Sequence, residues 1–342
     1  MLFQKIFVEY QVAEYPQTLK ILAKLPNTPV HFIGKIEDIF ERAKKPYLQK
    51  RTSLNLFIGR KEGQLVKLAP DAYGVEGDPH YYFIHAYNCI YECEYCYLQG
   101  YFHSPDIVFF VNHEEIAAEI KNRVSGHPTA QTVWFHAGEF SDSLALCHIS
   151  GELEFYWKLF RELPAAKLEL RTKSVNIKPV LELEPLDNII ISFSLSPKEA
   201  VVAFDRKTPS LNARLKALKK LAAAGFQLGL HFDPIIYSDN FEYDYNLLIN
   251  SVLQAVPERQ INYISLGVVR FSRKSFAEFA KNYPHSQLLA AEFIKSFDDK
   301  IRYNRPQRLF ILKTVRAICR SAGISEEKIY LCMENESLKE SI

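Results

Sequence analysis

The residues best suited to chemistry are three cysteines within residues 88–99, where Cys89, Cys93 and Cys96 follow the spacing Cys-x3-Cys-x2-Cys. The other three cysteines are scattered through a chain of 342 residues. Six randomly placed cysteines would give this spacing in only roughly 0.2% of such chains. Three thiolates can hold three corners of a [4Fe–4S] cube, because soft sulfur ligands suit iron–sulfur clusters. The fourth iron then keeps an open coordination position for a small chelating ligand.

A structural zinc site is the alternative kind of metal centre, with His85 or His103 as the fourth ligand. Zinc sites more often combine one closely spaced cysteine pair with a second, distant pair, and the chain lacks such a second pair. The spacing therefore favours a cluster and leaves zinc as the competing interpretation.

The composition predicts an ordinary globular protein, with 48% hydrophobic and 24% charged residues and a net charge of +2. The first twenty residues include the charged side chains Lys5, Glu9, Glu14 and Lys20, so we expect no signal peptide. No apolar run approaches the length of about eighteen residues that a membrane span needs. A thiol cluster without a disulfide framework makes a reducing cytoplasm the expected location.

Short apolar segments alternate with helical ones, and this pattern predicts βαβ units that form a parallel sheet. The predicted strands are residues 81–85, 132–135, 167–171, 188–193, 226–232 and 262–269, and the predicted helices are residues 114–123, 152–161, 211–224 and 245–256. The cysteine loop follows the first strand, on the C-terminal face where the active sites of barrels collect. Residues 1–75 form a predicted α/β appendage, with a helix at 37–44 and a strand at 53–59. The barrel is expected at 76–285, and a basic helical extension packed on it at 286–342.

The C-terminal region carries the clearest charge feature, because residues 300–320 include seven basic residues and no acidic residue. A helix that begins near Pro306 would place four basic side chains on one face, namely Arg308, Lys313, Arg316 and Arg320. A solvated surface is one interpretation, and contact with nucleic-acid phosphates is the other. The residues predicted to make such contacts are Arg270, Arg273, Lys274, Arg302, Tyr303 and Arg305.

The cysteine loop resembles the signature of the radical S-adenosylmethionine (SAM) enzymes residue for residue. The resemblance implies a partial (β/α)6 TIM-type barrel, a [4Fe–4S] cluster and SAM, whose amino and carboxylate groups chelate the open iron. In that superfamily an electron from the reduced cluster cleaves SAM, and the resulting 5′-deoxyadenosyl radical abstracts hydrogen from the substrate. The cofactors carry this chemistry, and the protein positions them. An electron donor such as flavodoxin or ferredoxin is an implied partner.

Within that superfamily the chain resembles the spore photoproduct lyase family over nearly its whole length, beginning with Lys50-Arg-Thr-Ser-Leu-Asn-Leu-Phe-Ile-Gly59 in the appendage. The loop Cys93-Glu-Tyr-Cys-Tyr-Leu-Gln99 has tyrosines on both sides of its last cysteine. Four later stretches follow in the family's order: Phe135-His-Ala-Gly-Glu-Phe-Ser-Asp142, Leu170-Arg-Thr-Lys-Ser174, Ile191-Ser-Phe-Ser194 and Phe232-Asp-Pro-Ile-Ile236. The resemblance implies a DNA substrate that contains a pyrimidine photoproduct, which would be extruded from the duplex to be reached.

The same resemblance implies roles for six further residues. Gly138-Glu139 is similar to the element that holds the SAM amino group, and Lys173 lies where the family pairs a lysine with the SAM carboxylate. Ser141 and Ser194 are expected to hydrogen-bond the ribose or carboxylate, although strand-end serines are often simple caps. Tyr95 and Tyr97 are expected to pack against the cofactor, with Tyr97 as a radical relay. At His136, His231 and Asp233, packing or supporting hydrogen bonds are favoured over a direct role.

One departure from the family pattern affects the predicted reaction. The family places a hydrogen-donating cysteine at the position of Glu139, and a carboxylic O–H bond is too strong to replace it. Cys147 is eight residues further along and would need a different loop path. A radical SAM paralogue with another substrate therefore remains an alternative, as does a nucleic-acid-binding protein with a structural metal site.

Overall fold

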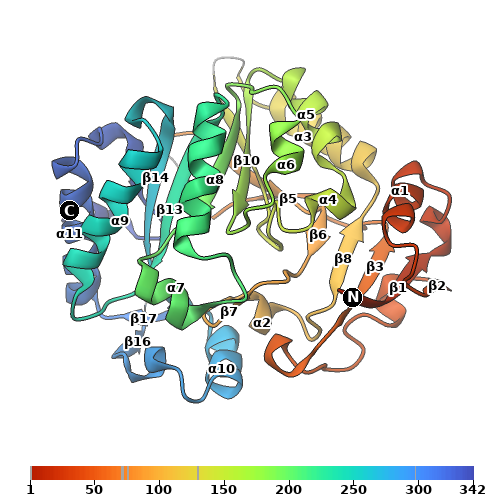
Figure 1. The fold of residues 1–342 in the computed structure, drawn as a ribbon, viewed down its shortest axis with the longest axis horizontal. Helices are drawn as coiled ribbons and strands as arrows, with labels where there is room; N and C mark the ends of the chain where they lie inside the picture. Colours follow the sequence, from red (N-terminus) through yellow and green to blue (C-terminus); the bar gives the residue numbers. More distant parts are fainter. Residues whose placement is uncertain (1, 71–72, 75–76, 129–130, 297) are drawn as a thin grey trace.

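The centre of the protein is a curled sheet of eight strands, seen in a computed structural model that describes residues 2–70, 73–74, 77–128, 131–296 and 298–342 (Figure 1). Seven neighbouring strands run parallel: β5 (His80–Phe83), β9 (Val133–Ala137), β10 (Ala166–Thr172), β11 (Ile189–Ser194), β13 (Gln227–Ile235), β14 (Ile261–Val268) and β18 (Ile329–Leu331). The antiparallel β4 (Val66–Leu68) closes one edge. The first six parallel strands are the six that the sequence predicts, and β18 adds a seventh from the C-terminal region.

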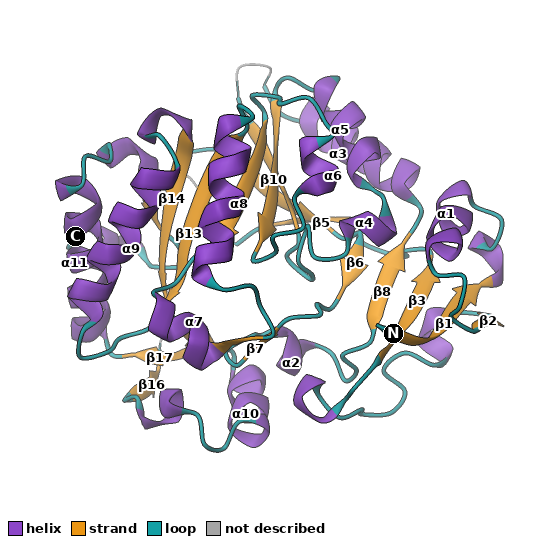
Figure 2. Ribbon diagram, viewed as in Figure 1, coloured by secondary structure: helices purple, strands orange, loops and turns teal. Residues whose placement is uncertain are grey.

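Helices cover the outer face of this sheet, as Figure 2 shows. They are α3 (His113–Ser125), α5 (Leu153–Arg161), α6 (Lys178–Leu181), α8 (Leu211–Ala223), α9 (Phe241–Ala255) and α11 (Arg305–Ser321). The four predicted barrel helices are confirmed as α3, α5, α8 and α9. Ser210 caps α8 by accepting a hydrogen bond from the Ala213 backbone N–H, because the first turn of a helix has free N–H groups.

Alternation along the strands separates an apolar face from a polar one. In β10, Leu168 and Leu170 point outward into the main hydrophobic core, whereas Glu169 is buried on the inner face with its polar neighbours. In β13, Gly229 lets the Tyr263 ring cross the lumen, since a Cβ atom there would lie 2.6 Å from that ring. The lumen is therefore a packed polar interior.

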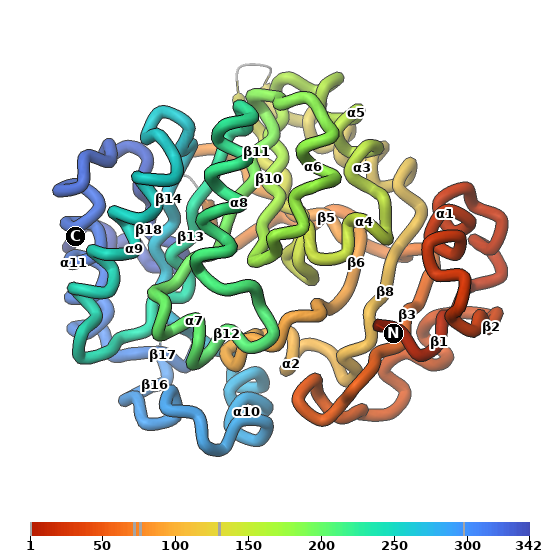
Figure 3. Tube along the Cα trace, in the orientation of Figure 1, coloured from red at the N-terminus to blue at the C-terminus, as the bar shows by residue number. Residues whose placement is uncertain are grey.

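A second sheet of five strands lies beside the barrel, in the order β2-β1-β3-β8-β6 (Figure 3). Its strands are β1 (Phe3–Glu9), β2 (Val30–Ile33), β3 (Leu54–Gly59), β6 (Ala86–Tyr87) and β8 (Ile107–Phe110), and α1 (Pro16–Lys24) lies against it. The strand predicted at 53–59 is confirmed as β3. The helix predicted at 37–44 is wrong. This segment forms only a 3-10 turn at Ile36–Asp38, which is pinned because the Glu9 carboxylate accepts the Ile36 N–H at 2.8 Å.

Shorter elements surround the C-terminal ends of the barrel strands. They are β7 (Glu92–Cys93), α2 (Leu98–Tyr101), α4 (Cys147–Ser150), α7 (Lys198–Phe204), β12 (Asp205–Arg206), β15 (Arg270–Phe271), α10 (Arg273–Asn282), β16 (Phe293–Lys295), β17 (Ile301–Tyr303) and α12 (Glu336–Lys339). The 3-10 helices are Tyr10–Val12, Ile36–Asp38, Leu48–Lys50, Glu258–Gln260, Gln287–Ala290 and Glu326–Lys328. Strand pairing crosses both predicted domain boundaries. Across the boundary at residues 75 and 76, β4 joins the barrel sheet, and β6 and β8 join the N-terminal sheet. Across the boundary at residues 285 and 286, β18 joins the barrel sheet. Within the described ranges, no helix has the length and apolar character to cross a membrane.

Candidate active site

The three predicted metal ligands lie in a loop that is fixed at its base and its middle. Asn88 takes up a positive φ of 66°, which asparagine tolerates, and its side-chain amide donates to the Ser104 and Asp106 carbonyls at 2.8 Å each. Cys93 lies in β7, which pairs with β12. The Cys96 backbone N–H donates to the Cys93 carbonyl at 3.0 Å. The loop therefore presents its cysteines from a defined backbone.

The donor set of this loop fits a cluster that binds each thiolate at a different iron. Burial raises the pKa of Cys89, Cys93 and Cys96, and all three lie close enough for Lys173 to oppose that rise. In the described part of the chain, no three His, Cys, Asp or Glu side chains converge closely enough to hold one metal ion. Cluster ligation does not need such convergence, because the thiolates occupy separate corners.

The loop after β9 brings Glu139 and Ser141 toward the barrel mouth. Gly138 has a φ of 91°, and a Cβ there would lie 2.5 Å from the Ser143 hydroxyl, so this turn requires glycine. Burial raises the pKa of Glu139, while Arg171 and a hydrogen bond from Tyr97 oppose that rise. The Ser141 hydroxyl is buried without a partner among the described residues. An unpartnered buried hydroxyl is costly, so it suits a ligand with polar groups.

Asp142 joins this loop to the end of β10. Its Oδ1 accepts the Leu144 and Ala145 backbone N–H groups at 3.0 and 2.9 Å and the Thr172 hydroxyl at 2.6 Å, and its Oδ2 accepts the Lys173 backbone N–H at 2.8 Å. The carboxylate therefore fixes Lys173 relative to the Glu139 loop.

Lys173 points toward the cysteine loop rather than into solvent. Its ammonium lies 3.7 Å from Asp205 and 5.5 Å from the centroid of the Tyr95 ring. Asp205 also accepts the Tyr95 hydroxyl and, at 2.9 Å, an Arg214 N–H. These cationic neighbours hold the pKa of Asp205 below its usual value although burial would raise it. Arg214 also donates to the Ser194 carbonyl at 3.0 Å, which places the end of β11 in the same cluster.

A buried network fills the lumen below these residues. Glu169 accepts hydrogen bonds from Ser192, Tyr263 and the His231 Nε2–H at 2.5, 2.5 and 2.6 Å. Arg171 donates to His231 Nδ1 at 2.7 Å, so both nitrogens of this imidazole are engaged and its tautomer is fixed. Burial and Arg171 lower the pKa of His231 to about 4.

The strand-end residues His136, His231 and Asp233 all make contacts with other polar side chains of the barrel. His136 contacts Glu169, and Arg270 holds Asp233 with two hydrogen bonds of 2.9 and 3.0 Å.

Of the six residues predicted to contact nucleic acid, three are exposed, two are buried, and Arg270 is partly buried with its guanidinium bound to Asp233. Arg273 and Lys274 are exposed at the start of α10, and Arg305 is exposed at the start of α11. Arg302 and Tyr303 are only 1% and 2% exposed, so they are unavailable to a nucleic acid in this structure.

Arg308 does not belong to the exposed basic face that the sequence predicts for α11. Its side chain is buried and donates a hydrogen bond to Glu334 at 3.0 Å. Phe310, on the same helix, is 47% exposed. Charge periodicity alone misplaced Arg308, because Glu334 from the C-terminal segment supplies a buried counter-charge.

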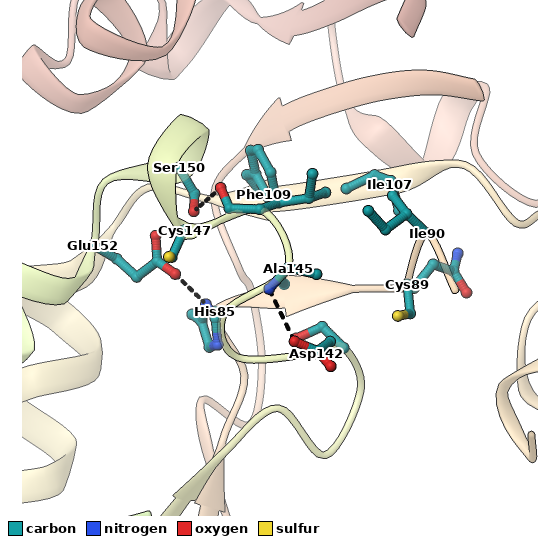
Figure 4. Close-up of a pocket in the computed structure, with 14 residues that line it drawn as sticks. His85, Cys89, Ile90, Ile107, Phe109, Asp142, Ala145, Cys147, Ser150 and Glu152 are labelled. Atoms are coloured by element: carbon teal, nitrogen blue, oxygen red, sulfur yellow. Dashed lines mark hydrogen bonds and ion pairs between the residues drawn. The ribbon is translucent and has the colours of Figure 1, made fainter. Parts of the chain in front are cut away.

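A small pocket behind the cysteine loop contains Cys147 (Figure 4). His85 and Glu152 face each other there at 3.8 Å, and Cys89 and Ser141 line another part of the same pocket. Burial raises the pKa of Glu152 to about 7 and lowers that of His85 to about 4. Cys147 lines this pocket and is only 3% exposed.

Cys332 follows β18 at the end of the barrel strands, where Arg270 donates to its sulfur at 3.6 Å. Both Arg171 and Arg270 act electrostatically on Cys332 and on Glu139, so the thiol belongs to the group of charged residues at the barrel mouth.

Several residues of this region escaped prediction. Asp205 and Arg214 belong to no motif, and their importance arises from pairing across elements that are distant in sequence. Arg171 had a usable signal, because it stands in the quoted stretch Leu170-Arg-Thr-Lys-Ser174, two residues before Lys173. Cys332 gave no signal until β18 was seen to join the barrel.

The fold and the cysteine loop together define a partial barrel of the radical SAM class. The family model for spore photoproduct lyase matches residues 3–310. The chain belongs to the spore photoproduct lyase family, a family of radical SAM enzymes.

Comparison with individual proteins agrees with this assignment. The spore photoproduct lyase of Bacillus subtilis (strain 168) is 25% identical over 293 residues, which cover 83% of each chain. That of Clostridium acetobutylicum is 21% identical over 295 residues, which cover 84% of each chain.

Solved structures show the same fold. A cysteine-to-alanine variant of spore photoproduct lyase with a dinucleoside spore photoproduct superposes with a TM-score of 0.82 at 19% identity, covering 97% of this chain and 98% of the other. A double variant with bound SAM and the same dinucleoside gives a TM-score of 0.80 at 18% identity and the same coverage. The predicted partial barrel is therefore confirmed.

Proposed function

We propose that this chain binds a [4Fe–4S] cluster through Cys89, Cys93 and Cys96, cleaves SAM reductively, and repairs a pyrimidine photoproduct in DNA. The observation that carries the proposal is the convergence of the cysteine loop with Glu139 and Lys173 at the barrel mouth. Family membership supports the same conclusion, as do the relatives solved with SAM and with a dinucleoside photoproduct.

The chain's own residues would hold SAM through complementary charges. Glu139 would accept hydrogen bonds from the amino group, Lys173 would pair with the carboxylate, and the hydroxyls of Ser141 and Ser194 would hydrogen-bond the ribose or carboxylate. Asp142 would fix the Lys173 backbone relative to the Glu139 loop, and Asp205 would hold the Lys173 ammonium. When bound, the cluster and SAM supply a radical that abstracts hydrogen from the substrate.

The two tyrosines of the cysteine loop would have different tasks. Tyr97 is 37% exposed and hydrogen-bonds to Glu139, so we assign it the radical relay. The hydroxyl of Tyr95 donates to Asp205 and its ring lies against Lys173, so it is a positioning residue.

Further assignments complete the proposal. Arg273, Lys274 and Arg305 would contact DNA phosphates, since their guanidinium and ammonium groups are exposed. A flavodoxin or ferredoxin would reduce the cluster. All six cysteines are free thiols, which suits the reducing cytoplasm.

The test is repair by anaerobically reconstituted protein. Irradiated DNA would be incubated with protein, SAM and reductant, and dimer-type photoproducts would be counted by chromatography and mass spectrometry. The proposal predicts their loss with the native chain and their persistence with Cys93→Ala.

A second candidate, a radical SAM enzyme with another substrate, is favoured by Glu139, which replaces the family's hydrogen-donating cysteine. Cys147 does not stand at the Glu139 position: it is 3% exposed, and its sulfur contacts Asn176. SAM cleavage without any loss of photoproducts would support this candidate.

A further inference from the structure

A basic groove runs beside the cysteine loop, between residues 44–50, the segment that contains α2, and α10. Its cavity measures about 300 Å³. Four lysines and one glutamate are the charged residues that line it, namely Lys44, Lys45, Lys50, Lys281 and Glu278. The helices α2 and α10 lie next to each other in Figure 1, below the barrel.

Two of the four lysines have charges available for a partner. Lys44 pairs with Glu278, and Lys45 pairs with the buried Asp106. Lys50 and Lys281 are exposed, and within the described residues neither makes an ion pair. The groove therefore presents net positive charge to solvent.

The groove reaches the proposed cluster through one side chain. Tyr47 lines the cavity, and its hydroxyl hydrogen-bonds to the Cys96 sulfur. Asn88, which precedes the first cysteine, also lines it. The strand-end residues Glu139, Lys173 and Ser194 do not belong to this lining, so the groove approaches the cysteine loop from another side than the barrel mouth.

We propose that this groove is the docking site for a small acidic electron-transfer protein that carries a flavin or an iron–sulfur cluster. The inference rests on the proposed function, because it assigns the surface through which the cluster is reduced. Lys50 and Lys281 steer the acidic partner, and Tyr47 links the docked surface to Cys96. Charge complementarity of this kind raises association rates and sets orientation. Electron-transfer complexes have small interfaces, so a compact basic groove is sufficient.

The transfer itself balances with one electron. The reduced donor would lose one electron, and a [4Fe–4S] cluster held by Cys89, Cys93 and Cys96 would gain it, passing from the 2+ to the 1+ state. No bond forms or breaks.

DNA is the competing polyanion, and the position of the groove disfavours it. A lesion must reach the barrel mouth, where the SAM-binding candidates gather, whereas this groove leads to the ligand Cys96. The exposed residues proposed for DNA, Arg273, Lys274 and Arg305, are absent from the groove lining.

The experiment uses cluster-loaded protein, with reduced flavodoxin as the probe. The double variant Lys50→Glu/Lys281→Glu is compared with Lys219→Glu/Lys220→Glu, which reverses two exposed lysines on α8 outside the barrel. Calorimetry measures flavodoxin affinity at low and high salt, and stopped-flow absorbance measures the rate of cluster reduction by flavodoxin and by dithionite. We expect the groove variant to bind flavodoxin about tenfold more weakly at low salt and to be reduced by it correspondingly more slowly. Reduction by dithionite stays unchanged, and the control variant behaves as the native chain.

Each other outcome has a defined meaning. Native flavodoxin affinity and reduction rate in the groove variant would overturn the docking site. A groove variant that loses affinity for irradiated DNA but keeps flavodoxin binding would assign the groove to nucleic acid and also overturn it. Failure of the proposed function is seen separately, as absence of SAM cleavage under dithionite in the native chain.

Discussion

Replacing Asp205 by asparagine tests the buried charge cluster that positions Lys173. The side chain of Asp205 is 1% exposed, and Arg214, its partner at 2.9 Å, is 0% exposed. Lys173 lies 3.7 Å away and is 12% exposed. An amide keeps the volume but removes the negative charge, so one buried guanidinium and one nearly buried ammonium lose their counter-ion.

The expected loss of unfolding free energy is large. Breaking a buried ion pair by removing one partner costs about 3–5 kcal/mol. The substitution Tyr95→Phe removes only one hydrogen bond to the same carboxylate and should cost about 1.5–3 kcal/mol. Asp239→Asn, at an exposed site on the loop before α9, is the matched control and should change stability by less than about 0.5 kcal/mol.

The assay is urea denaturation of cluster-loaded protein under anaerobic conditions, followed by circular dichroism. With an m value of about 3 kcal/mol per M, the midpoint for Asp205→Asn falls by about 1 M or more. If Asp205→Asn and Asp239→Asn unfold at the same urea concentration, the charge cluster does not hold Lys173 as described.

Three further predictions concern other parts of the molecule. Glu139→Gln should weaken SAM binding to cluster-loaded protein about tenfold or more, because it removes a charged hydrogen-bond acceptor. Equilibrium dialysis measures this affinity, and a native value in the variant would show that Glu139 does not bind the SAM amino group. The folded-state pKa of Glu152 is raised to about 7 from 4.5, so the stabilising contribution of its protonated form is lost as pH rises through that interval. Glu152→Gln should therefore gain up to about 3 kcal/mol relative to the native chain between about pH 4.5 and pH 7, and denaturation curves whose difference does not change with pH would contradict this. Arg308→Met should lower the unfolding free energy by about 3 kcal/mol, because Glu334 loses a buried partner. Arg305→Met, at the exposed start of the same helix, should lower it by less than about 1 kcal/mol. Equal losses in the two variants would show that Arg308 is not a buried partner of Glu334.

Much of the fold was predictable because its signals are local. The barrel strands are short apolar runs bounded by helices, so their order and parallel arrangement follow from the chain, and the cysteine spacing marks the first loop of the barrel. The strand β18 was not predictable, because Ile329–Leu331 is too short to stand out and becomes a strand only by pairing with β14. The helix expected at 37–44 failed for a related reason, since the distant Glu9 determines the backbone there.

The candidate site shows the same division. Residues in motifs next to strand ends, such as Glu139 and Lys173, could be named from the sequence. Asp205 could not, because it acquires its role only when β12 pairs with β7 and brings it beside Lys173 and Arg214. Arg302 was misplaced because a basic residue in a basic segment resembles a surface residue until its buried partner Glu334 is known.

The central claim is that the loop of Cys89, Cys93 and Cys96 leaves one iron of a cluster open for SAM. The most direct measurement is electron paramagnetic resonance of the anaerobically reconstituted, reduced protein before and after SAM is added. The claim predicts four irons and four sulfides per chain and a [4Fe–4S] signal that changes when SAM binds. Bound zinc in place of iron, or a cluster signal that SAM leaves unaltered, would contradict it.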